Sequence, residues 1–310
     1  VSPRYSGGIG GHAAMLADQL RQHGFQIDFV DPPKIPIKNL KNPSFVITSS
    51  VSSFFKGSYD IVHAFNVPSA FAMKVARAKK RVLSIHGVFS DQVNALHSSI
   101  LSDIAGSTEK NFLKWADALT TDSKASQKTY KEKLGLDFAY MPSPIDTTKF
   151  QDLGEVEKKE NQIAYVGRDS YEKGIDILRQ IEPKIKGSVV YSTNLTWKEA
   201  MRAIKSSSIV VVPSRMESLP TVVKEAFYLK VPVIATTVGG IPELVIDGNT
   251  GILVPPENPE TLLEKINSLL QDKEYAKKLT DAAYDFVVNN MTWDTILPKY
   301  VKFYESILES

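Results

Sequence analysis

The 310-residue chain contains no cysteine, and no apolar run comes near the length of a membrane-spanning helix. The first absence excludes disulfides, thiolate zinc sites and a cysteine nucleophile, and it is compatible with a reducing cytoplasm, where we expect the protein to work. The second excludes a bilayer-spanning helix within these residues, since such a helix needs about 20 mostly apolar residues.

A strong excess of one charge is also missing, because 37 Lys and Arg face 35 Asp and Glu. This balance argues against a nucleic-acid-coating protein and against a disordered acidic tail. The balance conceals an asymmetry: residues 1–150 hold 18 basic and 12 acidic side chains, and the remainder hold 19 and 23. Opposite signs indicate two domains, the first facing an anionic partner, or else a chance fluctuation in surface composition.

Short apolar segments alternate with helical patterns along the whole chain. This alternation is typical of βαβ units, so the predicted fold class is α/β with parallel sheets. Predicted strands span Gln26–Val30, Ile61–Ala64, Val82–Ile85, Ala118–Thr121, Gln162–Val166, Ser188–Tyr191, Ile209–Val212, Val233–Ala235 and Gly251–Val254. Predicted helices span His12–His23, Ser69–Ala78, Asp91–Ala116, Ser123–Leu134, Gly174–Ile181, Thr196–Lys205, Val222–Leu229, Ile241–Ile246, Glu260–Leu270 and Thr292–Leu308.

A proline-punctuated segment, Met141–Asp146, reads as the linker between two domains. We therefore expect a first domain over 1–145, a second over 146–290, and a last helix over 291–310 that packs back on the first. That helix presents four aromatic residues on one face: Trp293, Tyr300, Phe303 and Tyr304. At the other terminus, Val1 is expected to be the last residue of a first strand that this sequence lacks.

Three segments that follow predicted strands combine charge with glycine. In the first, Arg168 and Lys173 stand between a strand and a helix, and two cations beside free helix amides suit a diphosphate. In the second, Glu217 lies in a loop and Glu225 on the next helix, and carboxylates at two depths suit the hydroxyls of a sugar or ribose. The third contains Gly239-Gly240, which permits close backbone approach.

Each segment also has a purely structural explanation: solvated surface cations, a helix-dipole acid beside a surface acid, and an ordinary capping turn. Parallel strands, however, place the segments at their carboxyl ends on one sheet edge, where open α/β sheets bind ligands. This common location favours one binding site over three separate structural explanations.

These motifs resemble the family-4 retaining glycosyltransferases, also called group 1, which have two Rossmann-like domains facing a cleft (the GT-B fold). The resemblance covers nearly the whole chain and is most specific over 162–256, where Glu217…Glu225 and Arg168…Lys173 occur with the run KEAFYLKVPVIATTVGGIPELVIDGNTGILVPP. In the first half, the glycine-rich Ser6–Gly11 and Ser84-Ile-His86-Gly87 match the family pattern.

The resemblance implies a role for each matching residue. Arg168 and Lys173 would neutralise the donor diphosphate, Glu225 would hold the ribose, and Glu217 would contact the transferred sugar. The backbone amides of Ser218, Leu219 and Pro220 would lie near the sugar hydroxyls and phosphate. In the first domain, His86 would face the C6 region of the sugar, and Gly8, Gly10 and Gly11 would let the backbone approach the phosphates or the acceptor.

The implied activity is transfer of a hexose, with retention of configuration, from a UDP-, GDP- or ADP-linked sugar to a carbohydrate or lipid-linked acceptor. No cofactor is expected, and we expect no metal because the sequence lacks the Asp-x-Asp pattern by which the other glycosyltransferase fold holds one. A single predicted strand between Ile181 and Ile209, where the family often has two, leaves the base undecided.

Several alternatives remain open. Gly8-x-Gly10-x-x-Ala13 imitates a dinucleotide fingerprint, but a true one turns straight from its strand, and Ser2–Ser6 intervene here. The histidines are scattered without ligand spacing, so only His86 is expected to be functional. The basic loop 32–41 is a connector or contacts anionic groups such as lipid headgroups at the inner membrane face. A nucleotide-sugar 2-epimerase and a non-catalytic sugar-binding protein are the rival functions.

Overall fold

The computed structural model describes residues 8–30, 41–87 and 110–310, with only the backbone described over 41–43. The chain forms two compact units, residues 1–142 with 296–310, and residues 143–295. The first change of unit therefore falls inside the proline-punctuated linker. The interpretations of Val1, of Ser2–Ser6 and of most of the basic loop lie outside the described residues.

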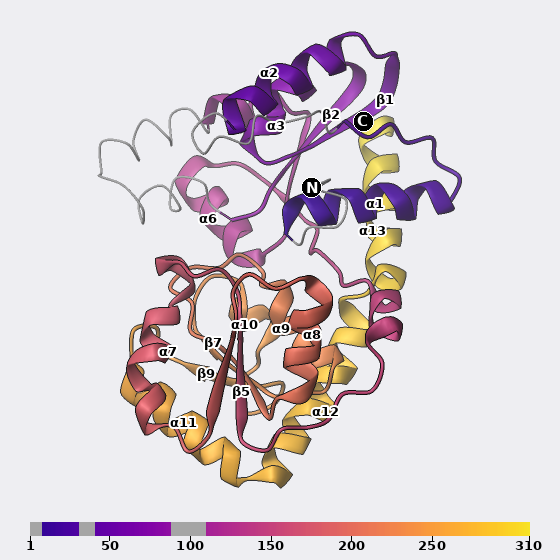
Figure 1. Cartoon of the computed structure of the whole chain (residues 1–310). Helices are drawn as coiled ribbons and strands as arrows, with labels where there is room; N and C mark the ends of the chain where they lie inside the picture. The colour runs from indigo at the N-terminus through magenta and orange to yellow at the C-terminus, as the bar shows by residue number, and fades with distance from the viewer. Residues whose placement is uncertain (1–7, 31–40, 88–109) are drawn as a thin grey trace. The chain divides into compact units, whose positions relative to one another are not determined.

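The first unit contains a parallel sheet in the order β1-β2-β3-β4 (Figure 1). Its strands are β1 (Ser58–Phe65), β2 (Arg77–Ile85), β3 (Ala118–Thr121) and β4 (Ala139–Tyr140). Its helices are α1 (Ile9–Gln22), α2 (Lys41–Phe54), α3 (Val67–Val75), α6 (Lys124–Leu134) and the larger part of α13 (Trp293–Glu309). The predicted return of the C-terminal helix to this unit is confirmed, since Tyr300 and Tyr304 contact its histidines.

The first unit differs from the sequence prediction in three places. Residues 26–30 form no strand: together with β1 they line a cavity of about 550 Å³, so they lie without a neighbouring strand to which their backbone could bond. Helix α2 was not predicted, because its serines and β-branched residues have low helix propensity. The helix predicted over Asp91–Ala116 ends at Leu113 in the structure. Its residues before 110 lie outside the described part of the chain.

The second unit contains a five-stranded parallel sheet in the order β6-β5-β7-β8-β9. Its strands are β5 (Gln162–Val166), β6 (Ser188–Ser192), β7 (Ile209–Val212), β8 (Val233–Thr236) and β9 (Ile252–Val254). Its helices are α7 (Ile175–Ile181), α8 (Trp197–Ser206), α9 (Thr221–Tyr228), α10 (Ile241–Leu244), α11 (Pro259–Gln271) and α12 (Lys273–Asn290), with single 3₁₀ turns at Thr147–Leu153, Tyr171–Lys173 and Glu182–Lys184. Of these, α12 was not predicted.

This sheet is buried on both faces, as its continuous apolar strands predicted. Successive side chains alternate: Ile209 and Val211 pack with α7 and α11, whereas Val210 and Val212 pack with α8 and α9. Figure 1 shows these helix pairs on opposite sides of the sheet. Two parallel α/β units of this kind confirm the predicted fold class.

Candidate active site

The three charged and glycine-rich segments lie at one edge of the second sheet. They follow β5, β7 and β8, which are adjacent and parallel, so their carboxyl ends point the same way. The sequence prediction that these segments share an edge is confirmed. An edge of this kind is where open parallel sheets bind ligands.

Backbone hydrogen bonds join the three segments. The N–H groups of Arg215 and Met216 donate to the Glu172 carbonyl oxygen at 2.9 and 3.2 Å, which ties the loop after β7 to the loop after β5. The Gly240 N–H donates to the Ser218 carbonyl oxygen at 2.8 Å, which ties the loop after β8 to the same central loop. The central loop is thus fixed from both sides.

Two glycines permit this close packing. Gly239 has φ of 53°, and a Cβ atom there would lie 1.8 Å from the carbonyl oxygen of Glu217. Gly174 has φ of 64°, and a Cβ atom there would lie 1.9 Å from the Pro213 carbonyl oxygen. Both positions require glycine for two reasons: the backbone is in the left-handed region, and there is no room for a side chain.

Lys173 and Glu217 meet across this edge. The Lys173 Nζ atom lies 2.6 Å from Glu217 Oε1, and the Ser214 hydroxyl donates to the same oxygen at 2.9 Å. The Glu217 side chain is only 9% exposed, and that of Lys173 is 24% exposed. Residues 44 apart in sequence thus present one positive and one negative group from neighbouring loops. Ser214 was not singled out from the sequence, although it stands in the same loop.

Arg168 lies apart from this ion pair. Its guanidinium pairs with Glu172 at 2.9 Å, and its side chain is 74% exposed. A better-anchored arginine was missed: Arg215 makes two 2.8 Å hydrogen bonds to Asp176, one of 2.8 Å to Glu257, and lies over the Tyr171 ring. Because these partners occupy its hydrogen-bond donors, Arg215 stabilises the loop after β7.

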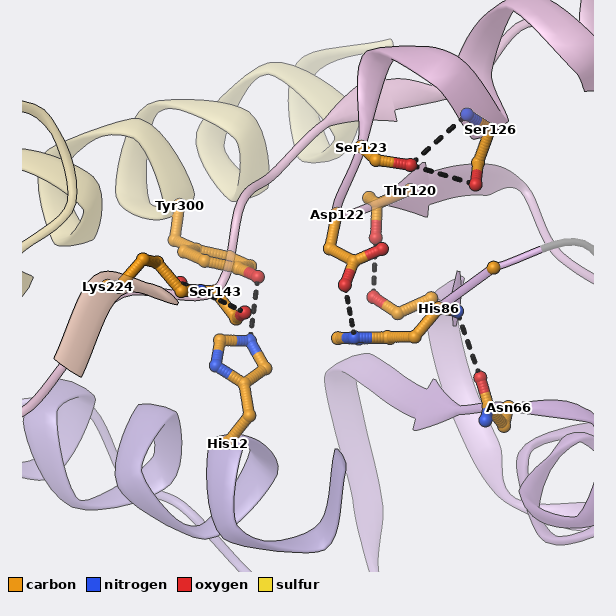
Figure 2. A network of polar contacts seen from close by, with 12 residues as sticks. His12, Asn66, His86, Thr120, Asp122, Ser123, Ser126, Ser143, Lys224 and Tyr300 are labelled. Carbon is orange, nitrogen blue, oxygen red and sulfur yellow. Dashed lines mark hydrogen bonds and ion pairs between the residues drawn. The ribbon is translucent and has the colours of Figure 1, made fainter. Parts of the chain in front are cut away.

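Glu225 lies on α9, apart from the Lys173–Glu217 ion pair, and is buried. The Trp197 indole N–H donates to its Oε1 atom at 2.7 Å. Burial raises the pKa of Glu225, and the hydrogen bond from Trp197 and the charge of Lys224 partly oppose that rise. The neighbouring Lys224 is fully buried and donates to the carbonyl and hydroxyl oxygens of Ser143 (Figure 2). The sequence analysis named neither Trp197 nor Lys224.

The remaining predicted residues of this unit form the turn into α9. Leu219 and Pro220 are buried, Ser218 is half-buried, and Pro220 is the N-cap residue of the helix. Proline has no N–H, so Pro220 can offer only its carbonyl oxygen to a ligand. Of the three backbone amides expected near the sugar hydroxyls and phosphate, only those of Ser218 and Leu219 can donate a hydrogen bond.

In the first unit, a buried side-chain contact and a backbone hydrogen bond hold His86. Its Nδ1 atom lies 3.2 Å from Asp122 Oδ2, and both side chains are buried. Its backbone N–H donates to the Asn66 side chain at 3.0 Å, as Figure 2 shows. Gly8 precedes α1 with φ of 78°, whereas Gly10 and Gly11 belong to the first turn of that helix. Asp122 is a further residue that the sequence analysis did not name.

Three of the five histidines, although far apart in the sequence, lie close together in the structure. His12, His63 and His86 gather in the first unit, where the His12 and His86 rings lie 5.6 Å apart. His12 Nε2 lies 3.0 Å from the Tyr300 hydroxyl, and His63 contacts Tyr304 and Ser84 at 2.7 and 2.6 Å. Burial, with a smaller contribution from His86, lowers the pKa of His63 to about 3.

The described residues contain neither a metal-binding cluster nor a membrane-spanning helix. No group of three or more His, Asp or Glu side chains there is arranged to hold a metal ion. No helix in the described part of the chain combines the length and apolar character that a membrane span requires.

Two family models match the chain, one in each half. The model described as Glycosyltransferase Family 4 matches residues 6–149, and the model described as Glycosyl transferases group 1 matches residues 181–286. The chain belongs to the family-4, group 1 glycosyltransferases. An uncharacterized glycosyltransferase of Methanocaldococcus jannaschii is 23% identical over 99% of this chain and 96% of its own. A putative teichuronic acid biosynthesis glycosyltransferase of Bacillus subtilis is 28% identical over 74% of this chain and 66% of its own.

Solved structures agree on the fold of this glycosyltransferase. Sucrose-phosphate synthase from Thermosynechococcus elongatus superposes with a TM-score of 0.78 at 19% identity, covering 98% of this chain and 94% of that one. Anabaena HepE in complex with UDP-glucose superposes with a TM-score of 0.65 at 18% identity, covering 97% and 90%. These similarities support the GT-B fold for this chain.

Proposed function

We propose that this glycosyltransferase moves a hexose from a nucleoside diphosphate sugar to an acceptor hydroxyl, with retention of configuration and without a metal ion. The observation that carries the proposal is the Lys173–Glu217 ion pair, held at 2.6 Å on a sheet edge by a loop that is fastened on both sides. In this role Lys173 contacts the diphosphate and Glu217 the sugar.

The chemistry needs a fixed cation at this place. As the bond between the anomeric carbon and the phosphate oxygen breaks, negative charge grows on the diphosphate and positive charge on the sugar. Preorganised charges beside those atoms stabilise the transition state more than mobile ones, because they need no reorganisation. Lys173 is positioned by Glu217, whereas the exposed Arg168 is the more mobile second cation.

Retention would follow from attack on the same face that the leaving group departs. The departing phosphate oxygen takes the proton from the acceptor hydroxyl, and the hydroxyl oxygen forms the new bond to the anomeric carbon. No enzyme carboxylate forms a covalent intermediate in this scheme. Metal independence is proposed because the sequence contains no Asp-x-Asp, and Lys173 with Arg168 supplies positive charge instead.

The nucleotide is assigned to the second unit. Glu225 would take the ribose, and the base would lie near the segment that links β6 to α8. Anabaena HepE was solved with UDP-glucose, and Arabidopsis starch synthase IV with ADP and acarbose, so the fold accommodates more than one base. A carbohydrate or lipid-linked acceptor would bind to the first unit.

Thermal denaturation with UDP, GDP and ADP tests this proposal, because a ligand that binds only the folded state raises its midpoint. We expect one of the three to raise the midpoint, and the matching sugar nucleotide to release its diphosphate only when an acceptor is present. Lys173→Ala and Glu217→Gln should lower turnover by about three orders of magnitude, which corresponds to about 4 kcal/mol of transition-state stabilisation.

Lys265→Ala is the matched control, since this lysine lies on α11 and pairs with its neighbour Glu264. Near-normal turnover in the Lys173 or Glu217 variant would refute the site assignment. No midpoint shift with any of the three nucleotides would refute the donor. Conversion of the sugar nucleotide without an acceptor would instead identify the 2-epimerase, and binding without turnover the sugar-binding protein.

A further inference from the structure

We propose that one face of α2, with the basic residues beside it, docks the first unit on an anionic lipid surface. The docking face consists of Ile47, Val51, Phe54 and Phe55, and the basic rim consists of Lys56, Lys74 and Arg77. Docking of this kind goes beyond the proposed function and is independent of the donor, the acceptor and the reaction.

Helix α2 exposes its large apolar side chains. The four residues of the docking face are between 53% and 79% exposed. Their spacing, at positions 47, 51, 54 and 55, places them on one side of a helix, and Phe55 directly follows the last residue of α2. The Phe54 and Phe55 rings meet edge to face with their centroids 5.4 Å apart. One apolar strip therefore runs along the exposed side of α2.

The buried side of α2 carries serines instead. Ser44, Ser49 and Ser53 are 9% exposed or less, and the Ser49 hydroxyl donates to the Val46 carbonyl oxygen of the same helix at 3.3 Å. A surface helix of a globular protein normally buries its large apolar residues and exposes its polar ones. Because α2 reverses this arrangement, its apolar side indicates a partner that the described residues do not supply.

Basic residues border the docking face. Lys56 follows Phe55, and the Arg77 guanidinium donates to the Lys56 carbonyl oxygen at 3.4 Å. Lys74 lies in the last turn of α3, which packs beside α2 (Figure 1). Lys74 and Arg77 are both exposed, so their charges reach the surface around the apolar strip.

The charge of this part of the chain is mostly of one sign. Residues 44–87, all of which the structure describes, contain six Lys and Arg and one acidic residue, Asp60. Asp60 pairs with Lys79 at 2.7 Å, and Asp28 of a preceding segment pairs with Lys56 at 3.6 Å. These two carboxylates offset part of the positive charge, and a net positive charge remains.

An anionic membrane fits this combination better than a second copy of the chain. Two copies that met through the same face would bring their basic rims together, and like charges repel. Anionic headgroups would instead attract the rim, while the apolar side chains enter the boundary between headgroups and acyl chains. A helix with an apolar side and basic flanks can lie in the plane of this boundary without spanning the bilayer.

Docking through this face leaves the end of the sheet near His86 uncovered. Helices α2 and α3 end just before β1 and β2 begin, and the first residues of these strands, Ser58 and Arg77, pair with each other. His86 follows the opposite end of β2, and a strand from Arg77 to Ile85 spans about 26 Å. The basic rim and His86 therefore lie at opposite edges of the sheet.

Co-sedimentation with lipid vesicles, without any nucleotide, tests the proposal. The vesicles contain phosphatidylcholine with or without phosphatidylglycerol, and the salt concentration is about 0.1 M or about 1 M, where charges are screened beyond about 10 Å and about 3 Å. We expect binding to the anionic vesicles at the lower salt concentration and at least about tenfold weaker binding to the neutral ones. The higher salt concentration should release most of the protein from the anionic vesicles.

Variants of exposed residues test the docking face without disturbing the core. Phe55→Ser should weaken binding to anionic vesicles by about tenfold, and Ile47→Ser by less, because less apolar surface enters the lipid. Ile246→Ser is the matched control, since Ile246 is an exposed apolar residue of the second unit, and it should bind like the wild type. Lys74→Gln combined with Arg77→Gln should weaken binding to anionic vesicles by about tenfold and leave binding to neutral vesicles unchanged.

A fluorescent side chain reports the contact directly. Brominated phosphatidylglycerol should quench the added emission of Phe55→Trp, because the indole would lie among the lipids. The same vesicles should leave the added emission of Ile246→Trp unquenched. Subtracting the wild-type signal removes the contributions of the native tryptophans, Trp115, Trp197 and Trp293.

Several results would overturn the docking face: no binding to anionic vesicles, equal binding to neutral and anionic vesicles, or wild-type binding by both Phe55→Ser and Ile47→Ser. Sedimentation velocity without lipid tests the other occupant. If the chain is a dimer and Phe55→Ser makes it a monomer, the face joins two copies and the lipid proposal is wrong.

Discussion

At the scale of single residues, the backbone conformation and the contacts of Gly239 require a glycine at this position. Its φ of 53° is a conformation that side chains disfavour, and a Cβ atom would lie 1.8 Å from the Glu217 carbonyl oxygen. Since that oxygen is backbone, relief requires the loop that carries Glu217 to move. The residue therefore couples the turn after β8 to the position of the ion pair.

We predict that Gly239→Ala lowers the free energy of unfolding by about 2–4 kcal/mol and reduces turnover beyond that loss of stability. Gly248→Ala is the control, because Gly248 has φ of 71° but the nearest atom to a Cβ there is the Tyr275 hydroxyl oxygen at 3.7 Å. The control should lose only about 1 kcal/mol from backbone strain and keep its turnover. Urea titration and initial rates check both variants, and equal effects would contradict the role of the contact.

At the scale of elements, the strands of the second unit and all its helices except α12 could be predicted, whereas part of the first unit could not. The apolar strands β5 and β7 were predicted with the bounds observed, because burial on both faces leaves a continuous apolar run with sharp ends. Residues 26–30 also contain three apolar residues, Ile27, Phe29 and Val30, but form no strand. A strand needs a neighbouring strand for its backbone hydrogen bonds, and the local sequence does not show whether such a neighbour is present.

The residues of the candidate site also divide into those that could be predicted from the sequence and those that could not. Lys173, Glu217 and the glycines were predictable, because strand ends and glycine pairs are local signals that parallel topology brings together. Trp197 was not predictable, because its meaning depends on Glu225, 28 residues away, and an aromatic residue at a helix start normally indicates only packing. The histidine cluster was missed for the same reason, since His12, His63 and His86 come from three separate elements.

The contact between β1 and α13 yields a prediction for pH dependence. His63 on β1 bonds to Tyr304 of α13 and to Ser84 of β2, and its pKa is lowered to about 3, mainly by burial. An unfolded histidine ionises near pH 6.5, so as the pH falls below about 6.5 the unfolded state takes up the proton first. Stability should then fall toward low pH, by at most about 1.4 kcal/mol per pH unit from this group.

His63→Gln removes this titration while keeping a polar side chain against Tyr304. Its free energy of unfolding, measured between pH 7.5 and 4.5, should depend less steeply on pH than that of the wild type. His23→Gln, at an exposed position at the end of α1, is the matched control and should keep the wild-type slope. Parallel curves for His63→Gln and wild type would contradict the lowered pKa, because they would mean that His63 takes up its proton at the same pH in the folded and unfolded states.

At the scale of the whole molecule, the first unit consists of two segments that are far apart in the sequence, and the second unit consists of the residues between them. Residues 296–310 belong with residues 1–142, and within this segment Ile296, Leu297 and Tyr300 are almost fully buried. Tyr300 also bonds to His12, on a helix near the opposite end of the sequence. Residues 296–310 therefore complete the first unit, whereas residues 143–295 form the second unit without them.

Deletion of residues 296–310 should thus destabilise one unit selectively. Loss of several buried apolar side chains, each worth about 1.5–3 kcal/mol, exceeds what a single unit of this size can absorb. We expect hydrogen exchange to show loss of protection in β1 and β2, while β5 and β7 stay protected. Tyr300→Phe, which removes only the hydroxyl, should keep both units folded. Equal loss of protection in β5 and β7 would mean that the two units fold as one cooperative body, with the last helix stabilising both.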